Sequence, residues 1–182
     1  QVNKKVYDVC INKEHKPNNY DLEYEYDIIF LPYRDVRDSF ISTVKRWSKR
    51  NDYINEMTKS INIFYSLLSY SKTKKVYLFK YEDYSLEYIK QLCSFLELKI
   101  KDKQIIKIMR RLNELHNSKE LPLKKANTKN KLYMKSLLTQ RHNTSGGKIG
   151  KYINYFTLEQ KTEILSNIKI HRFLEEYGYL HR

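Results

Sequence analysis

The apolar residues of this chain alternate between short continuous runs and positions spaced as on a helix. Continuous apolar runs of six residues or fewer predict buried strands. Apolar residues three and four positions apart predict helices that bury one face. The runs predict strands at Val6–Ile11, Ile28–Tyr33 and Val76–Lys80, and the helical spacing predicts helices after Arg34 and over residues 52–70, 85–96 and 102–115. Strands that alternate with helices predict an α/β domain with a short parallel sheet flanked by helices.

The pattern changes from strand to helix at Arg34. The apolar strand ends at Tyr33, and Phe40, Ile41, Val44 and Trp47 then recur at helical spacing. Either Asp35 or Asp38 is suited to the helix start. In open α/β sheets ligands bind at the carboxyl ends of the strands, and a helix N-terminus there favours phosphate. Arg34 adds a planar, charged donor, so this turn is a candidate phosphate site.

A lysine and a histidine follow the first predicted strand. In an extended backbone, residues two apart point to the same side, so Lys13 and His15 project together before Pro17 ends the strand. A cation beside an imidazole is suited to acid–base chemistry and charge stabilisation. The same pattern in a basic protein also fits a solvated surface pair.

The charge of the chain is strongly positive and unevenly distributed. The 182 residues carry a net charge of +14, and we expect them to form a single domain, 1–182. Between Lys99 and Lys151 there are fifteen lysines and arginines but three acids. We therefore expect an anionic partner: a phosphorylated nucleotide, an acidic glycan or nucleic acid.

The remaining composition limits the class of protein. No apolar run is long enough to span a membrane. Cys10 and Cys93 lie in apolar contexts without metal-ligand spacing, so we interpret them as buried thiols and expect a reducing, cytoplasmic location. No Walker A loop is present, which argues against a nucleotide kinase.

The turn at Arg34 resembles the 3'-phosphate site of the sulfotransferases that use 3'-phosphoadenosine-5'-phosphosulfate (PAPS). In that family a strand is followed by an Arg-Asp-Pro-Arg-Asp-like segment and by a serine eight residues after the first arginine. Here the segment is Arg34-Asp35-Val36-Arg37-Asp38, and Ser42 stands at the serine position. The resemblance implies that Arg34 and Ser42 bind the 3'-phosphate of PAPS and of its product adenosine 3',5'-bisphosphate (PAP).

Other segments resemble the same family in the same order. Lys13-Glu14-His15-Lys16-Pro17 is similar to its Lys-Thr-His-Leu-Pro segment. The resemblance implies that His15 is the general base for the acceptor hydroxyl and that Lys13 stabilises charge on the bridging oxygen. Tyr81-Glu82-Asp83 is similar to the Tyr-Glu-Asp that ends a family strand, which implies that Tyr81 lies near the adenine.

A late glycine-rich segment is similar to the family pattern Arg-Lys-Gly-x-x-Gly-x-Trp-x-x-x-Phe-Thr. Gly147, Gly150, Phe156 and Thr157 match it, and Tyr152 replaces the tryptophan. Ser145 and Gly146 stand at the Arg-Lys positions, so Arg141 or Lys148 is expected to reach the phosphate instead. The family also places the basic segment 116–151 over the site as a mobile cover.

The family's Lys/Arg-Ser-Gly-Thr/Ser-Thr-Trp loop, which holds the 5'-phosphosulfate, has no counterpart in this sequence. We expect either that the loop lies upstream of Gln1 or that this is a degenerate relative that keeps half of the cofactor site. In both cases the resemblance implies a P-loop-NTPase-like sulfotransferase fold, and we expect this chain to lack the first strand and loop of that fold.

The function that the resemblance implies is transfer of a sulfuryl group from PAPS to a hydroxyl or amine of a glycan or small molecule, without a metal. Two alternatives remain. One is a sulfotransferase-like scaffold without activity. The other is a nucleic-acid-binding protein that uses the surface 99–151, which would bind in a salt-dependent way without Arg34.

Overall fold

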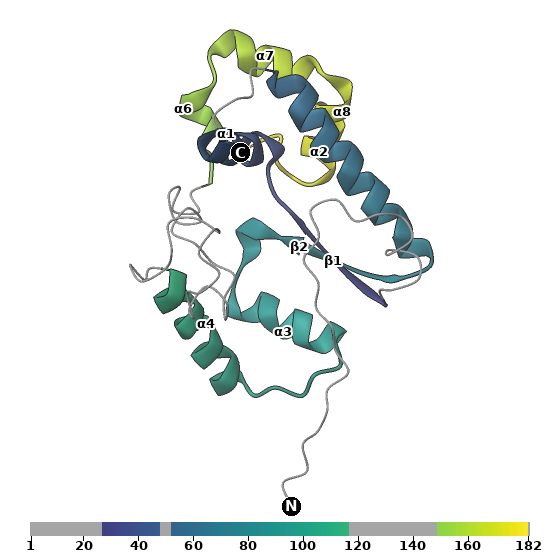
Figure 1. Cartoon of the computed structure of the whole chain (residues 1–182), viewed down its shortest axis with the longest axis vertical. Helices are drawn as coiled ribbons and strands as arrows, with labels where there is room; N and C mark the ends of the chain where they lie inside the picture. Colours follow the sequence, from purple (N-terminus) through teal and green to yellow (C-terminus); the bar gives the residue numbers. More distant parts are fainter. Residues whose placement is uncertain (1–26, 48–51, 117–148, 182) are drawn as a thin grey trace, which may run out of the picture.

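The computed structural model describes residues 27–47, 52–116 and 149–181 (Figure 1). Two strands and seven α-helices occur in these residues. They are β1 (Ile28–Tyr33), α1 (Val36–Trp47), α2 (Tyr53–Leu68), β2 (Lys75–Lys80), α3 (Leu86–Phe95), α4 (Asp102–His116), α6 (Tyr152–Tyr155), α7 (Leu158–Ser166) and α8 (Ile168–Glu176). The predicted α/β class is confirmed, and the predicted strand Val6–Ile11 lies outside the described residues.

The two strands form a parallel pair that brings their carboxyl ends together. The register runs from Ile28 opposite Lys75 to Tyr33 opposite Lys80. Parallel strands require a crossover connection, which α1 and α2 supply here. Because Tyr33 and Lys80 are partners, the next residues, Arg34 and Tyr81, leave the sheet at the same edge.

The prediction that both strands are fully buried was wrong. In β1 the residues alternate: Ile29 and Leu31 are buried, whereas Phe30 is 41% exposed. In β2 no residue is fully buried. A short apolar run does not by itself tell how many faces of a sheet are covered, and the aromatic residues Phe30 and Tyr77 instead contact each other edge to face.

The core lies between the sheet and the helices α1, α2 and α8. Helix α2 contributes Met57, Ile61 and Phe64, which recur at helical spacing as predicted. Helix α8 adds Ile170, Phe173 and Leu174, and Figure 1 shows α8 beside α2. These side chains form one hydrophobic cluster with Ile29 and Leu31, so both ends of the described chain are joined through one core.

Helix α3 packs near β2 through tyrosine hydrogen bonds. The hydroxyl of Tyr88 donates to the carbonyl of Leu78 (2.8 Å) and accepts from the amide of Lys80 (2.6 Å). The helix carries no fully buried residue, and Cys93 is half-buried. Cys10 lies outside the described residues.

Helix α7 has Thr157 as its N-cap residue, with a reciprocal capping box between Thr157 and Gln160. None of the helices that the structure describes is long and apolar enough to cross a membrane.

Candidate functional site

Arg34 is a mostly buried cation at the carboxyl edge of the sheet. Its side chain is 17% exposed, and its guanidinium carbon lies 4.7 Å from the ring centroid of Tyr81. Nη2 lies 3.7 Å from Oδ2 of Asp38, which is too long for a hydrogen bond. Nε and Nη2 are buried and have no hydrogen-bond partner among the residues that the structure describes. Buried donors are almost always satisfied, so these two require an explanation such as a ligand.

Asp35 caps the N-terminus of helix α1, which settles the choice between Asp35 and Asp38. Oδ1 of Asp35 accepts a hydrogen bond from the amide of Arg37 (2.9 Å), and its carbonyl accepts from the amide of Ser39 (2.9 Å). Asp35 is thus the N-cap residue, and Asp38 lies in the first turn with a different role.

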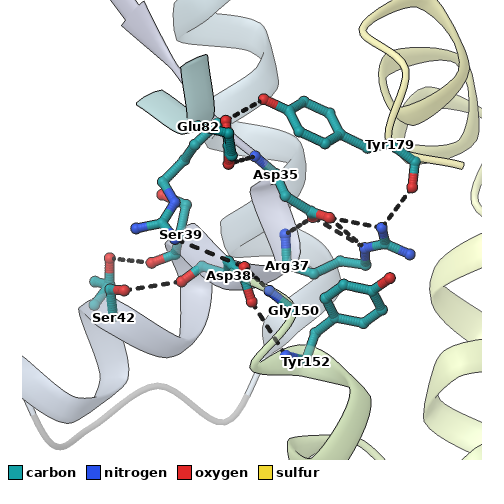
Figure 2. A network of polar contacts seen from close by, with 11 residues as sticks. Asp35, Arg37, Asp38, Ser39, Ser42, Glu82, Gly150, Tyr152 and Tyr179 are labelled. Carbon is teal, nitrogen blue, oxygen red and sulfur yellow. Dashed lines mark hydrogen bonds and ion pairs between the residues drawn. The ribbon is translucent and has the colours of Figure 1, made fainter. Parts of the chain in front are cut away.

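Arg37, the second arginine of the segment, is held in an internal network. Its guanidinium binds both carboxylate oxygens of Asp35, with Nη2 2.6 Å from Oδ2, and donates to the carbonyl of Tyr179 (2.7 Å). It also lies 3.6 Å from the ring centroid of Tyr152. Figure 2 shows Arg37 between Asp35, Tyr152 and Tyr179, so we assign it a structural role.

Asp38 joins the late glycine-rich segment to the start of α1. Its carboxylate is fully buried and accepts from the amides of Gly150 (2.7 Å) and Tyr152 (3.1 Å), as Figure 2 shows. Gly150 has a φ of +77°, which favours glycine at this turn. The same carboxylate faces Arg34, so Asp38 brings the backbone at Gly150 close to the candidate phosphate site.

Ser42 lies one turn after Asp38 on the same side of α1, since the two are four residues apart. Its hydroxyl donates to the carbonyl of Asp38 (3.0 Å) and is half-buried. A serine hydroxyl rotates freely, so it can exchange this backbone carbonyl for a ligand oxygen.

The structure therefore places Arg34 against Tyr81 and connects Arg34 to Ser42 through Asp38. The other predicted site residues lie outside the described residues: Lys13, His15, Arg141, Gly147 and Lys148. Sequence reasoning missed the structural roles of Arg37 and Asp38. Each also binds a partner more than a hundred residues away along the chain, and no local pattern identifies such contacts.

A pocket of about 280 Å³ opens beside Arg34 at the end of β1. Its lining is mostly apolar, with Arg34 and Tyr81 among the lining residues. Ile61, Phe64 and Phe173 contribute from α2 and α8. An apolar pocket with a charged donor is suited to a ligand that has both a flat apolar part and an anionic part.

The tyrosines around the site keep their protons. Burial raises the pKa of Tyr179, and its hydrogen bond to Glu82 raises it further. Burial also raises the pKa of Tyr33. Within the described part of the chain, no group of His, Cys, Asp and Glu side chains is arranged to hold a metal ion.

Replacing Arg37 tests the internal network. Arg37→Met leaves the buried Asp35 carboxylate without its cation, so we expect a loss of about 3–5 kcal/mol in the free energy of unfolding, measured in urea. Arg172→Met, at an exposed position of α8, serves as the control and should change it by less than about 0.5 kcal/mol. Equal effects of the two substitutions would contradict the assignment.

Comparison with known proteins identifies the family. The family model described as "Sulfotransferase domain" matches residues 12–173, which is most of the chain. The comparisons with curated proteins and with solved structures gave no match. The family match agrees with the resemblance of the Arg34 segment, and the chain belongs to the sulfotransferase family.

Proposed function

We propose that this sulfotransferase uses PAPS and that Arg34 and Ser42 bind the 3'-phosphate of the cofactor. The observation that carries the proposal is the buried Arg34 guanidinium, whose Nε and Nη2 lack hydrogen-bond partners within the described part of the chain. A phosphate supplies several acceptor oxygens to such a planar donor, and the interaction is strong in a site with little water.

The surroundings of Arg34 fit a nucleotide better than a free anion. Tyr81 lies against the guanidinium and is 42% exposed, so much of its side chain is accessible to an adenine. The adjacent pocket is mostly apolar, as a purine requires. The backbone near Gly150 approaches the same place through Asp38, and it supports a role for the late glycine-rich segment, with Gly147 and either Arg141 or Lys148, in binding the phosphate.

We further propose the chemical roles of His15 and Lys13. PAPS would supply the activated sulfuryl group. His15 takes the proton from the acceptor hydroxyl as the oxygen attacks, and Lys13 stabilises the negative charge on the oxygen that leaves. The acceptor is a hydroxyl or amine of a glycan or small molecule, and the positive charge of the chain favours an acidic glycan.

The cofactor proposal is tested by calorimetric titration with PAP and with adenosine 5'-monophosphate, which lacks the 3'-phosphate. We expect the wild-type protein to bind PAP more tightly than adenosine 5'-monophosphate. Arg34→Ala should weaken PAP binding by roughly tenfold to a hundredfold, since a hydrogen bond to a charged group contributes about 1.5–3 kcal/mol. The monophosphate should bind both proteins alike.

Arg110→Ala is the matched control for this titration. Arg110 lies on α4, its side chain is 75% exposed, and its removal deletes the same charge. It should leave the preference for PAP unchanged. If Arg34→Ala keeps the preference, or if both substitutions reduce it equally, the 3'-phosphate site is wrong. Tight nucleic-acid binding that Arg110→Ala weakens and Arg34→Ala does not would favour the alternative use of the basic surface.

The proposed base is tested by sulfuryl transfer from labelled PAPS to a phenol, an alcohol and an acidic glycan. His15→Ala should lower the rate by about 10²- to 10⁴-fold without changing the affinity for PAP, because general-base catalysis contributes to the reaction and not to cofactor binding. His181→Ala removes an exposed imidazole elsewhere and should leave the rate unchanged. A normal rate in His15→Ala would exclude His15 as the base.

A further inference from the structure

We propose that Tyr179 and Glu82 are positioning residues that keep the guanidinium of Arg34 available to its anion. The inference rests on the proposed function, since it takes Arg34 to be the residue that binds phosphate. It adds that phosphate binding by Arg34 also depends on the C-terminal Tyr179, which lies far from Arg34 in the sequence.

Glu82 is the carboxylate that bridges the two turns of the site. It lies next to Tyr81, in the 3-10 turn Tyr81–Asp83 that follows β2. Oε1 accepts a hydrogen bond from the amide of Asp35 (3.3 Å), the residue after Arg34, and Oε2 accepts from the hydroxyl of Tyr179 (2.8 Å). Figure 2 shows Glu82 between these two donors. Glu82 therefore holds the turn that carries Tyr81 to the turn that carries Arg34.

The same contacts give both carboxylate oxygens of Glu82 donors other than Arg34. Tyr81 lies against the guanidinium of Arg34, and Glu82 is the next residue of the same turn. Among the described residues, however, Glu82 forms no ion pair with Arg34, and Nε and Nη2 of Arg34 are without hydrogen bonds. Each Glu82 oxygen instead accepts from another donor.

Tyr179 is fixed firmly enough to hold this carboxylate. Its side chain is fully buried, and its amide donates to the carbonyl of Leu174 (2.6 Å). Its carbonyl accepts from Arg37 (2.7 Å), and Gly178 turns the chain before it with a φ of +70°. The raised pKa of Tyr179 keeps the hydroxyl protonated, so it remains a donor at neutral pH.

Removing the hydroxyl of Tyr179 leaves one carboxylate oxygen of Glu82 without its donor. Glu82 is half-buried, and an unsatisfied carboxylate there raises the free energy of the protein. Arg34 has donors that are unsatisfied among the described residues, and Asp35, whose amide contacts Glu82, is the next residue. In Tyr179→Phe we therefore expect a new Glu82–Arg34 ion pair that satisfies both groups. That pair competes with the phosphate for the guanidinium.

The experiment compares PAP and adenosine 5'-monophosphate binding in Tyr179→Phe, Glu82→Gln and the double variant. Tyr179→Phe should weaken PAP binding by roughly fivefold, the equivalent of about 1 kcal/mol, and leave the monophosphate unaffected. Glutamine keeps an oxygen for the amide of Asp35 but has no charge, so Glu82→Gln should bind PAP at least as tightly as wild type. The double variant should regain the wild-type affinity.

Tyr65→Phe is the matched control, because Tyr65 donates a similar hydrogen bond to Glu176 (2.5 Å) between α2 and α8. It should lower stability without changing the PAP preference. A double variant as weak as Tyr179→Phe would overturn the inference, because a merely structural role predicts no rescue. If Tyr179→Phe does not fold, weaker PAP binding by Glu82→Gln alone would overturn it.

The two proposals fail in different ways. If Arg34→Ala leaves the PAP preference intact, the phosphate site itself is wrong. If Arg34→Ala removes the preference but Tyr179→Phe leaves it unchanged, only the roles of Tyr179 and Glu82 are wrong.

Discussion

The bidentate ion pair between Asp35 and Arg37 is the interaction on which the candidate site depends. The carboxylate of Asp35 caps α1 and binds the guanidinium, and the guanidinium binds the carbonyl of Tyr179 and lies on the ring of Tyr152. A buried ion pair of this kind adds little to the stability of the fold compared with two apolar side chains. Removing one partner, however, leaves an uncompensated buried charge and strongly destabilises the fold. The pair therefore fixes one arrangement of β1, α1, α6 and the C-terminal turn, and it holds the end of β1 where Arg34 begins.

The two arginines of one short segment have opposite roles, which follow from their partners. Arg37 has a carboxylate, a carbonyl and an aromatic ring around it, so its charge is compensated within the protein. Arg34 has a carboxylate oxygen 3.7 Å away and an aromatic face, and two of its buried nitrogens are without hydrogen bonds among the described residues. Asp38 contributes to this difference, because its oxygens accept from the amides of Gly150 and Tyr152 and do not come within hydrogen-bond distance of Arg34.

The sequence was informative where structure depends on local pattern. The parallel strands and the core face of α2 follow from periodicity, and the structure confirms them. The exposure of Phe30 could not be predicted from the sequence, because the burial of a strand depends on which elements cover the sheet. The roles of Arg37, Asp38 and Glu82 did not follow either, since their partners Tyr179 and Gly150 are distant in sequence. The predicted roles of Lys13 and His15 stay predictions.

The central claim is that the Arg34 guanidinium donates to the 3'-phosphate of the cofactor. Nuclear magnetic resonance tests it directly through the Nε–H signal of Arg34, assigned by its absence from Arg34→Ala. On titration with PAP we expect this signal to move downfield, as a new hydrogen bond to a charged oxygen requires, and adenosine 5'-monophosphate should leave it in place. An Nε–H signal that PAP does not move while PAP binds, or that both nucleotides move alike, would contradict the claim.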